Sequence, residues 1–237
     1  MMVVAKGISD LRFLVVFITL VVSAFGSCQS EQQTDKAHQL PEIYPTIHPG
    51  TYSSEEFKPS ISFNVGEGWK SGGEQSDSIW IAQGDPEKSY YIRSLGIINV
   101  SKVYEWYKLG KSDYVYSKQV PAPKDLVAWF HRHPYLQAGQ PEPITVGGVN
   151  GVQFDVAVDR PLPKNFAAAC GKNCVDLFGT SNERLTFLYE AFTAHIVILK
   201  DVKGDTVVIE FDSPDIEFDD FLPKAQKVVD SVKWEGE

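Results

Sequence analysis

The alternation of hydrophobic and polar positions predicts mostly β-strand between residue 50 and the C-terminus. Residues 61–65 (ISFNV) alternate and run into Gly66-Glu67-Gly68, a composition that commonly bounds strands. Residues 78–83 and 89–95 flank Gly84-Asp85-Pro86-Glu87, which is a strong turn signal. These two segments therefore predict a β-hairpin.

Further strands are predicted downstream. Residues 144–149 and 152–158 flank Asn150-Gly151, a dipeptide that suits a two-residue hairpin turn. Lys203-Gly204-Asp205 is another turn signal within the last third of the chain. Three consecutive apolar segments surround it and predict a three-stranded meander: residues 185–192, 196–202 and 206–211.

A helical period appears near the C-terminus. Pro223 is tolerated in the first turn of a helix, so we expect this helix to begin at Asp219 or Asp220 and to end at Ser231. Seven apolar residues fall on one face of it: Phe218, Phe221, Leu222, Ala225, Val228, Val229 and Val232.

A second, shorter helix is predicted over residues 124–131, between Pro123 and Pro134. Residues 97–118 show no clear period. Hairpins, a meander and a few helices, including the C-terminal amphipathic one, predict an α+β fold in which an antiparallel sheet is covered by helices.

The N-terminus has the layout of a signal peptide. Lys6 and Arg12 precede an apolar run from Phe13 to Val22, and the small residues Ser23, Ala24, Gly26 and Ser27 follow it. The largely apolar stretch from Phe13 to Gly26 has about fourteen residues, fewer than the roughly 18 that a membrane-spanning helix needs. We therefore assign residues 1–27 to an export signal.

Cys28 follows this segment directly and allows two processing routes. Phe25-Gly26-Ser27-Cys28 resembles a bacterial lipobox, in which the cysteine receives a lipid, although Phe25 replaces the usual Leu or Val. Ala24-Phe25-Gly26 also fits the small-x-small rule of an ordinary signal peptidase. We expect an extracytoplasmic lipoprotein anchored to the cell membrane through Cys28, with a secreted soluble protein as the alternative.

Residues 28–50 are predicted to be a disordered tether. The segment after Cys28 is polar and has no apolar period, and prolines follow at positions 41, 45 and 49. Such a segment buries too little apolar surface to fold, and we expect His38 and His48 to be solvated. Residues 51–237 then form a single globular domain, because their number lies within the single-domain range.

Acidic residues outnumber basic ones, 31 against 22. Loss of residues 1–27 would remove Lys6, Arg12 and Asp10, which gives the remaining chain a net charge of about −10. Nucleic acids and anionic surfaces attract clusters of Lys and Arg. The charge therefore argues against nucleic acid as a partner.

Cys170 and Cys174 form the remaining cysteine pair. Three intervening residues differ from the two-residue spacing of thioredoxin-type motifs, and a zinc site would need two more ligands nearby. We predict a structural disulfide, which export favours. Because this pairing leaves Cys28 as the odd thiol, it supports lipidation of Cys28.

The histidines give weak chemical signals. His131 and His133 are two residues apart near a predicted helix, so their side chains would diverge by about 200°. His195 lies in strand-like sequence. We interpret all three as structural residues.

Five acidic residues near the C-terminal helix are a candidate calcium site, because carboxylate oxygens are calcium ligands. Helix capping and an exposed acidic surface explain them without a metal. We therefore predict no metal site and no cofactor, with calcium as the alternative for these residues: Asp212, Asp215, Glu217, Asp219 and Asp220.

Aromatic residues gather between positions 104 and 116. Tyr104, Trp106 and Tyr107 are a candidate binding face, because flat rings stack on sugars or anchor partner proteins; core packing is the alternative. The chain contains no Gly-x-Ser-x-Gly, His-Glu-x-x-His or Gly-x-Gly-x-x-Gly motif. We assign no catalytic residue.

Three features follow one another along residues 57–234: the segment Ile61–Trp69, a glycine-bounded hairpin, and a Phe218-x-x-Phe221 helix that ends at Ser231. In this order of elements the chain resembles bacterial lipoproteins of the Mog1/PsbP-like type. Residues 125–151 are also similar to uncharacterised secreted proteins from Gram-positive and related bacteria. The resemblance implies an α+β fold and a binding or assembly module without a catalytic site.

The sequence thus predicts a noncatalytic binding or assembly module at the cell envelope, in contact with an unidentified protein or envelope component. The alternative is an extracytoplasmic hydrolase or thiol-redox enzyme. A hydrolase site would have to unite His131, His133 or His195 with carboxylates.

Overall fold

A computed structural model of the chain describes residues 37–41, 45–84, 93–108, 110 and 114–235. The predicted export signal, Cys28 and the first part of the predicted tether lie outside these residues. Among the residues that are described, no helix is both long and apolar enough to span a membrane.

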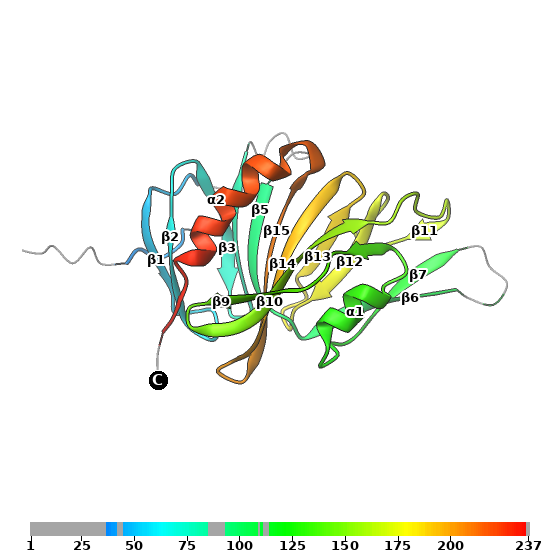
Figure 1. The fold of residues 1–237 in the computed structure, drawn as a ribbon, viewed down its shortest axis with the longest axis horizontal. Coiled ribbons are helices and arrows are strands. Elements are labelled where there is room, and N and C mark those ends of the chain that lie inside the picture. The colour runs from blue at the N-terminus through cyan, green and yellow to red at the C-terminus, as the bar shows by residue number, and fades with distance from the viewer. Residues whose placement is uncertain (1–36, 42–44, 85–92, 109, 111–113, 236–237) are drawn as a thin grey trace, which may run out of the picture. The chain divides into compact units, whose positions relative to one another are not determined.

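The fold is α+β, with three β-sheets and two α-helices in the described part of the chain (Figure 1). The largest sheet has eight strands, and its neighbouring strands are antiparallel. Its strands are, in spatial order, β3 (Trp69–Gln75), β4 (Ser78–Gln83), β5 (Arg93–Asn99), β15 (Asp205–Pro214), β14 (Phe192–Val202), β10 (Val149–Val158) and β8 (Leu136–Ala138), with β9 (Glu142–Val146) also beside β10.

The two smaller sheets complete the fold. One of them contains a parallel pair, β11 with β7, and its other pairs are antiparallel. Its order is β11 (Phe166–Ala167), β7 (Val115–Pro121), β6 (Lys102–Lys108), β12 (Cys174–Gly179) and β13 (Leu185–Tyr189). The other is antiparallel, with the order β1 (Gly50–Ser54), β2 (Ile61–Val65) and β16 (Lys233–Trp234).

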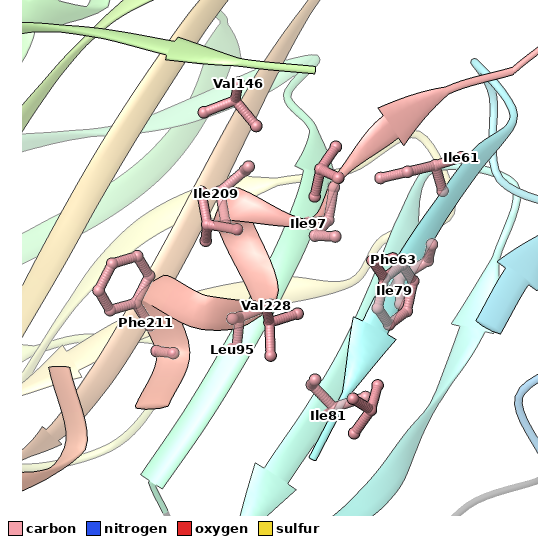
Figure 2. Packing of buried hydrophobic residues seen from close by; sticks show 14 of the residues in the cluster. Ile61, Phe63, Ile79, Ile81, Leu95, Ile97, Val146, Ile209, Phe211 and Val228 are labelled. Carbon is pink, nitrogen blue, oxygen red and sulfur yellow. The ribbon is translucent and has the colours of Figure 1, made fainter. Parts of the chain in front are cut away.

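Two hydrophobic clusters lie on opposite faces of the large sheet, because side chains alternate along each strand. The first cluster joins one face to the C-terminal helix α2 (Phe218–Asp230) and to β2. Figure 2 shows Val228 of α2 beside Leu95, with Ile209 and Phe211 in the same cluster. The face of α2 that packs on the sheet is the apolar face that its sequence pattern predicts.

The second cluster lies between the other face of the large sheet, the five-stranded sheet and helix α1 (Leu126–Arg132). Val208 and Ile196 of the large sheet belong to it, together with Phe130 of α1 and Phe178 of β12. A polar side chain on this face of β15 is therefore enclosed by protein.

The first predicted hairpin is present as β4 and β5, in which Gln83 pairs with Arg93. Residues 89–92, predicted to begin the second strand, lie outside the described residues. The second hairpin is also present, but its turn differs from the prediction. β9 and β10 turn at Gly147-Gly148 and not at Asn150-Gly151.

The physical reason for this correction lies in the backbone. Gly147 and Gly148 have φ values of 57° and 83°, and a type I′ turn requires positive φ at both central residues. Gly151 lies inside β10, where a Cβ would come within 2.4 Å of the Ile198 carbonyl oxygen. That glycine permits a close approach of β14 and does not form the turn.

The predicted meander is only partly present. β14 and β15 form a hairpin, with Val202 paired to Asp205, but β13 pairs with β12 in the five-stranded sheet. β14 already has β10 and β15 as its two neighbours, so no edge of it is left for β13. The strand therefore joins another sheet.

Both predicted helices are present, with shifted ends. Asp125 caps α1, and its Oδ1 accepts a hydrogen bond from Ala128 N at 3.0 Å. α2 begins at Phe218, after the 3₁₀ turn η2 (Asp215–Glu217), and contains Pro223. The segment without a clear period includes the end of β5, all of β6 and the start of β7.

The end of the predicted 28–50 tether belongs to the folded part. Leu40 and Ile47 are buried in the first cluster, and Ile47 N donates to Trp69 O at 3.0 Å. The His38 backbone forms an isolated β-bridge with Tyr52, while the residue itself is exposed, as expected. Apolar residues spaced too irregularly to show a period can still fill gaps in a core built by other elements.

Candidate functional site

The candidate binding face of Tyr104, Trp106 and Tyr107 is divided between the two faces of the β6–β7 hairpin. Alternation along β6 places Tyr104 and Trp106 on one face and Tyr107 on the other. Tyr104 is buried, and its hydroxyl accepts a hydrogen bond from Gln119 Nε2 at 2.6 Å. The three rings therefore do not form one surface.

Trp106 packs in an aromatic cluster beside α1. Its ring stacks on Phe166 with the centroids 4.2 Å apart, and its Nε1 donates to His133 Nε2 at 2.9 Å. Burial lowers the pKa of His133 to about 3, so the imidazole is neutral at physiological pH and accepts this hydrogen bond. A cavity of about 240 Å³ lies beside this pair.

Tyr107 lies on an aromatic ladder with Tyr114 and Tyr116, in which Tyr107 and Tyr114 are exposed and Tyr116 is half-buried. The Tyr107 and Tyr116 rings are 5.9 Å apart, and the Tyr114 and Tyr116 rings are 6.2 Å apart. Lys118 Nζ is 5.8 Å from the centroid of the Tyr107 ring. This ladder contains the exposed rings of the aromatic segment that the sequence analysis selected.

The three histidines do not converge on one site. His195 Nδ1 lies 2.6 Å from Asp155 Oδ1, and its ring stacks on Phe211 in the first hydrophobic cluster. His133 packs beside the second cluster, against Trp129. His131 contacts Phe154, with ring centroids 6.1 Å apart.

The acidic residues of the candidate calcium site point to different partners. Asp215 pairs with Arg160 and Glu217 pairs with Arg93, while Asp219 and Asp220 are exposed in the first turn of α2. Among the residues with described positions, no group of three or more His, Cys, Asp or Glu is arranged to hold a metal ion.

Cys170 and Cys174 form a disulfide with a Cα–Cα distance of 6.3 Å. The buried Asp176 orders the loop beside it, because its carboxylate accepts hydrogen bonds from the backbone N–H groups of Ala169 and Cys170 at 2.8 and 3.0 Å. Ser117 Oγ donates to the same carboxylate at 2.7 Å. The disulfide is part of a well-connected structural loop.

Two carboxyl groups, those of Glu210 and Asp212, line one small cavity. Glu210 and Asp212 lie on the same face of β15 as Val208, and Glu210 is only 1% exposed. A cavity of about 170 Å³ opens onto both groups, and eight residues line it: Trp80, Ser94, Arg184, Leu185, Thr186, Phe187, Glu210 and Asp212. We call this cavity the Glu210 pocket.

The Trp80 side chain lies over Gly96 of β5 and lines the Glu210 pocket. Trp80 and Glu210 both pair with Gly96, from β4 and β15 on either side of β5. A Cβ at position 96 would lie 2.6 Å from Cη2 of Trp80. The indole ring therefore lies directly over β5, where any side chain at position 96 would displace it.

The polar groups of the Glu210 pocket are incompletely satisfied. The Thr186 hydroxyl hydrogen-bonds to Glu210, and Ser94 Oγ donates to Asp212 Oδ1. Glu210 Oε2 and Trp80 Nε1 are buried and make no hydrogen bond with any described residue. Such buried, unpaired atoms are rare in native proteins and call for an explanation.

Burial also changes the ionisation of the two carboxyl groups. It raises the pKa of Glu210 well above 4.5, and the nearby charge of Asp212 raises it further. Burial raises the pKa of Asp212 to about 7, against the opposing hydrogen bond from Ser94. The pair therefore retains a proton near neutral pH.

From the sequence, Asp212 was grouped with the acidic residues for which calcium binding was the alternative, and Glu210 was not selected. The signal was present as two acidic residues at alternate positions of the apolar strand Val207–Phe211 and its continuation. Charges two residues apart in a strand share one face. In a central strand, that face is buried.

No protein-family model and no curated protein sequence matches the chain. Several solved structures are similar to it, including the following two. One is cyanobacterial PsbP (CyanoP) from Synechocystis, with 12% identity, a TM-score of 0.40, and coverage of 89% of this chain and 99% of that chain. The other is LpqN of Mycobacterium tuberculosis, involved in cell envelope biogenesis, with 13% identity, a TM-score of 0.38, and coverage of 79% and 91%. The PsbP type named from the sequence is thus represented among these structures.

Proposed function

We propose that the protein is a noncatalytic lipoprotein held outside the cytoplasm, where it acts as a binding or assembly module of the cell envelope. The observation that carries this proposal is the pairing of the thiols. Cys170 and Cys174 are joined in a disulfide, which leaves Cys28 as the one other cysteine of the sequence, directly behind the export signal. Lipid attachment gives that cysteine a role.

A binding role agrees better with the contacts than a hydrolase or thiol-redox enzyme does. His133 and His195 are both held in hydrogen bonds within packed surroundings, and the cysteine loop is fixed through Asp176. The partner that we propose is a protein or another envelope component. The ladder of Tyr107, Tyr114 and Tyr116 is the candidate contact surface, because aromatic rings anchor interfaces.

Replacement of Cys28 tests the anchoring. In a bacterial host that processes lipoproteins, the wild-type chain is expected in the membrane fraction and Cys28→Ala in the soluble extracytoplasmic fraction. Intact mass should show one diacylglyceryl modification on the wild-type chain and none on the variant. Cys170→Ala/Cys174→Ala is the matched control and should stay with the membrane. Membrane retention of Cys28→Ala would contradict the proposal.

A further inference from the structure

The Glu210 pocket is built around polar atoms that the described residues leave unpaired. Glu210 is almost fully buried, and its Oε2 has no partner there. An unpaired buried polar group costs about 1–3 kcal/mol. Four separate strands, β4, β5, β13 and β15, bring their side chains to this cavity.

The pocket offers hydrogen-bond donors and acceptors together. The Trp80 indole N–H can only donate, and the Glu210 and Asp212 carboxyl groups accept, or donate when protonated. Arg184 lines the wall, with its guanidinium 5.3 Å from the centroid of the Trp80 ring. A hydroxyl group donates one hydrogen bond and accepts two, so a ligand rich in hydroxyl groups matches both kinds of partner.

The charges of the pocket favour a neutral ligand over a cation. The carboxyl pair retains a proton near neutral pH, since the pKa of Asp212 is about 7 and that of Glu210 is raised as well. Calcium needs six to eight oxygen ligands, and Arg184 and the Trp80 N–H would both repel a cation. A neutral polar ligand avoids these conflicts.

The volume of the pocket limits the size of the ligand. At about 30 Å³ for each water, 170 Å³ corresponds to about six waters. That is the scale of a single sugar ring with its hydroxyl groups. Phe187 and Trp80 add apolar walls, and apolar walls with a few placed polar groups are typical of small-ligand sites.

We propose that the Glu210 pocket binds one monosaccharide unit, with Glu210 and Asp212 bonded to its hydroxyl groups and Trp80 Nε1 donating to a sugar oxygen. The proposal deepens the binding role proposed above and rests on it. The sugar would therefore bind on the face of the large sheet that is opposite α2.

Calorimetric titration of the purified full-length chain in detergent tests the site. The probes are glucose, galactose, mannose and N-acetylglucosamine, each up to about 10 mM, which detects Kd values in the millimolar range. At least one probe should bind saturably. Glu210→Leu, a shape-compatible apolar replacement at a buried site, should weaken that binding at least tenfold, and Trp80→Phe should weaken it several-fold by removing the N–H.

Glu217→Gln is the matched control, because it changes an acidic residue in the neighbouring turn η2, outside the pocket. This variant should bind the sugar with the affinity of the wild type. Circular dichroism and thermal unfolding establish that each variant is folded. Absence of saturable binding by all four sugars would overturn the inference, as would unchanged affinity in both Glu210→Leu and Trp80→Phe, or binding of calcium or methylammonium in place of a sugar. Membrane fractionation of Cys28→Ala is independent of these titrations, so failure of the sugar site is distinguishable from failure of the anchoring.

Discussion

At the scale of single residues, Glu210 and Asp212 are two acidic residues of one pocket wall, of which Glu210 is almost fully buried and Asp212 is half-buried. Both carboxyl groups lie on a buried face of a central strand, and both have raised pKa values. The folded chain therefore binds more protons than the unfolded chain between the ordinary carboxyl pKa and the raised one. Stability must fall as the pH rises through that window.

This linkage gives a prediction for Asp212→Asn. The pKa of Asp212 rises from 3.8 to about 7, so the wild-type free energy of unfolding should lose on the order of 1–3 kcal/mol from this group between about pH 4 and pH 7. Urea unfolding at pH 5 and pH 8 measures the loss. Asp212→Asn should lose clearly less than the wild type. Equal losses in the two proteins would contradict the raised pKa.

His133 gives a prediction of opposite sign. Burial lowers its pKa to about 3, so the folded chain holds a neutral imidazole whose contribution is complete above the unfolded value of 6.5 and is lost as the pH falls toward 3. Between about pH 6.5 and pH 5 this loss amounts to about 2 kcal/mol. His133→Gln should remove most of it in urea unfolding at these two pH values.

The same variant separates the His133 effect from other groups. His131→Gln is the control, since His131 is exposed on α1, and it should keep the acid loss of the wild type. At about pH 7.5, His133→Gln should cost about 1 kcal/mol, because the acceptor of the Trp106 hydrogen bond changes. If both variants retained the wild-type acid loss, His133 would not be the responsible group.

Residue-level inference from sequence succeeded where a local pattern was sufficient. The spacing of Cys170 and Cys174 predicted their disulfide, because only the short loop between them matters. Tyr104 and Tyr107 were assigned to one face because residues 97–118 had no assigned secondary structure. Once β6 is known, alternation separates them.

At the scale of elements, the β9–β10 hairpin shows how a turn can be misplaced by a few residues. Gly147 is constrained twice, by its φ of 57° and by the ring of Trp234, whose Cδ1 would lie 2.7 Å from a Cβ at this position. Gly148 has a φ of 83° and open space around it. The turn and the packing of β16 thus depend on the same glycine.

Alanine substitutions separate these two constraints. Gly147→Ala should destabilise the chain by about 2–3 kcal/mol, because backbone strain and displacement of Trp234 add, whereas Gly148→Ala should cost about 1 kcal/mol from strain alone. Gly66→Ala should change stability by less than about 0.5 kcal/mol, because a Cβ at position 66 would meet nothing within 4 Å and the residue has no positive φ. Urea unfolding measures all three. Equal costs at positions 147 and 148 would show that Trp234 moves freely.

Most strands were predictable from the sequence because alternation is local, but their partners were not. β13 and β14 are separated by two residues and yet belong to different sheets. β16 pairs with β2 across most of the chain. Such pairings depend on which strand edges remain available after the large sheet has formed, and no local pattern encodes that.

At the scale of the whole molecule, the large sheet separates two cores with different roles. The core under α2 is apolar and fills with residues from both ends of the folded part, from Leu40 to Val232. The opposite face carries the second apolar cluster and, next to it on β15, the Glu210 pocket. One face therefore supplies stability, whereas the other combines packing with the polar site.

The folded part of the chain begins earlier than the sequence predicted. Ile47 was expected in the tether, yet its side chain is 2% exposed in the core under α2, and its N–H bonds to Trp69 O at 3.0 Å. Ile47→Ala should therefore destabilise the chain by about 2–4 kcal/mol, as a cavity in a packed core does. Ile216→Ala, at a side chain that is 89% exposed, should cost less than about 0.5 kcal/mol. Equal unfolding midpoints in urea for the two variants would return Ile47 to the tether, whereas a large difference places the start of the folded part before residue 47 and shortens the tether behind Cys28.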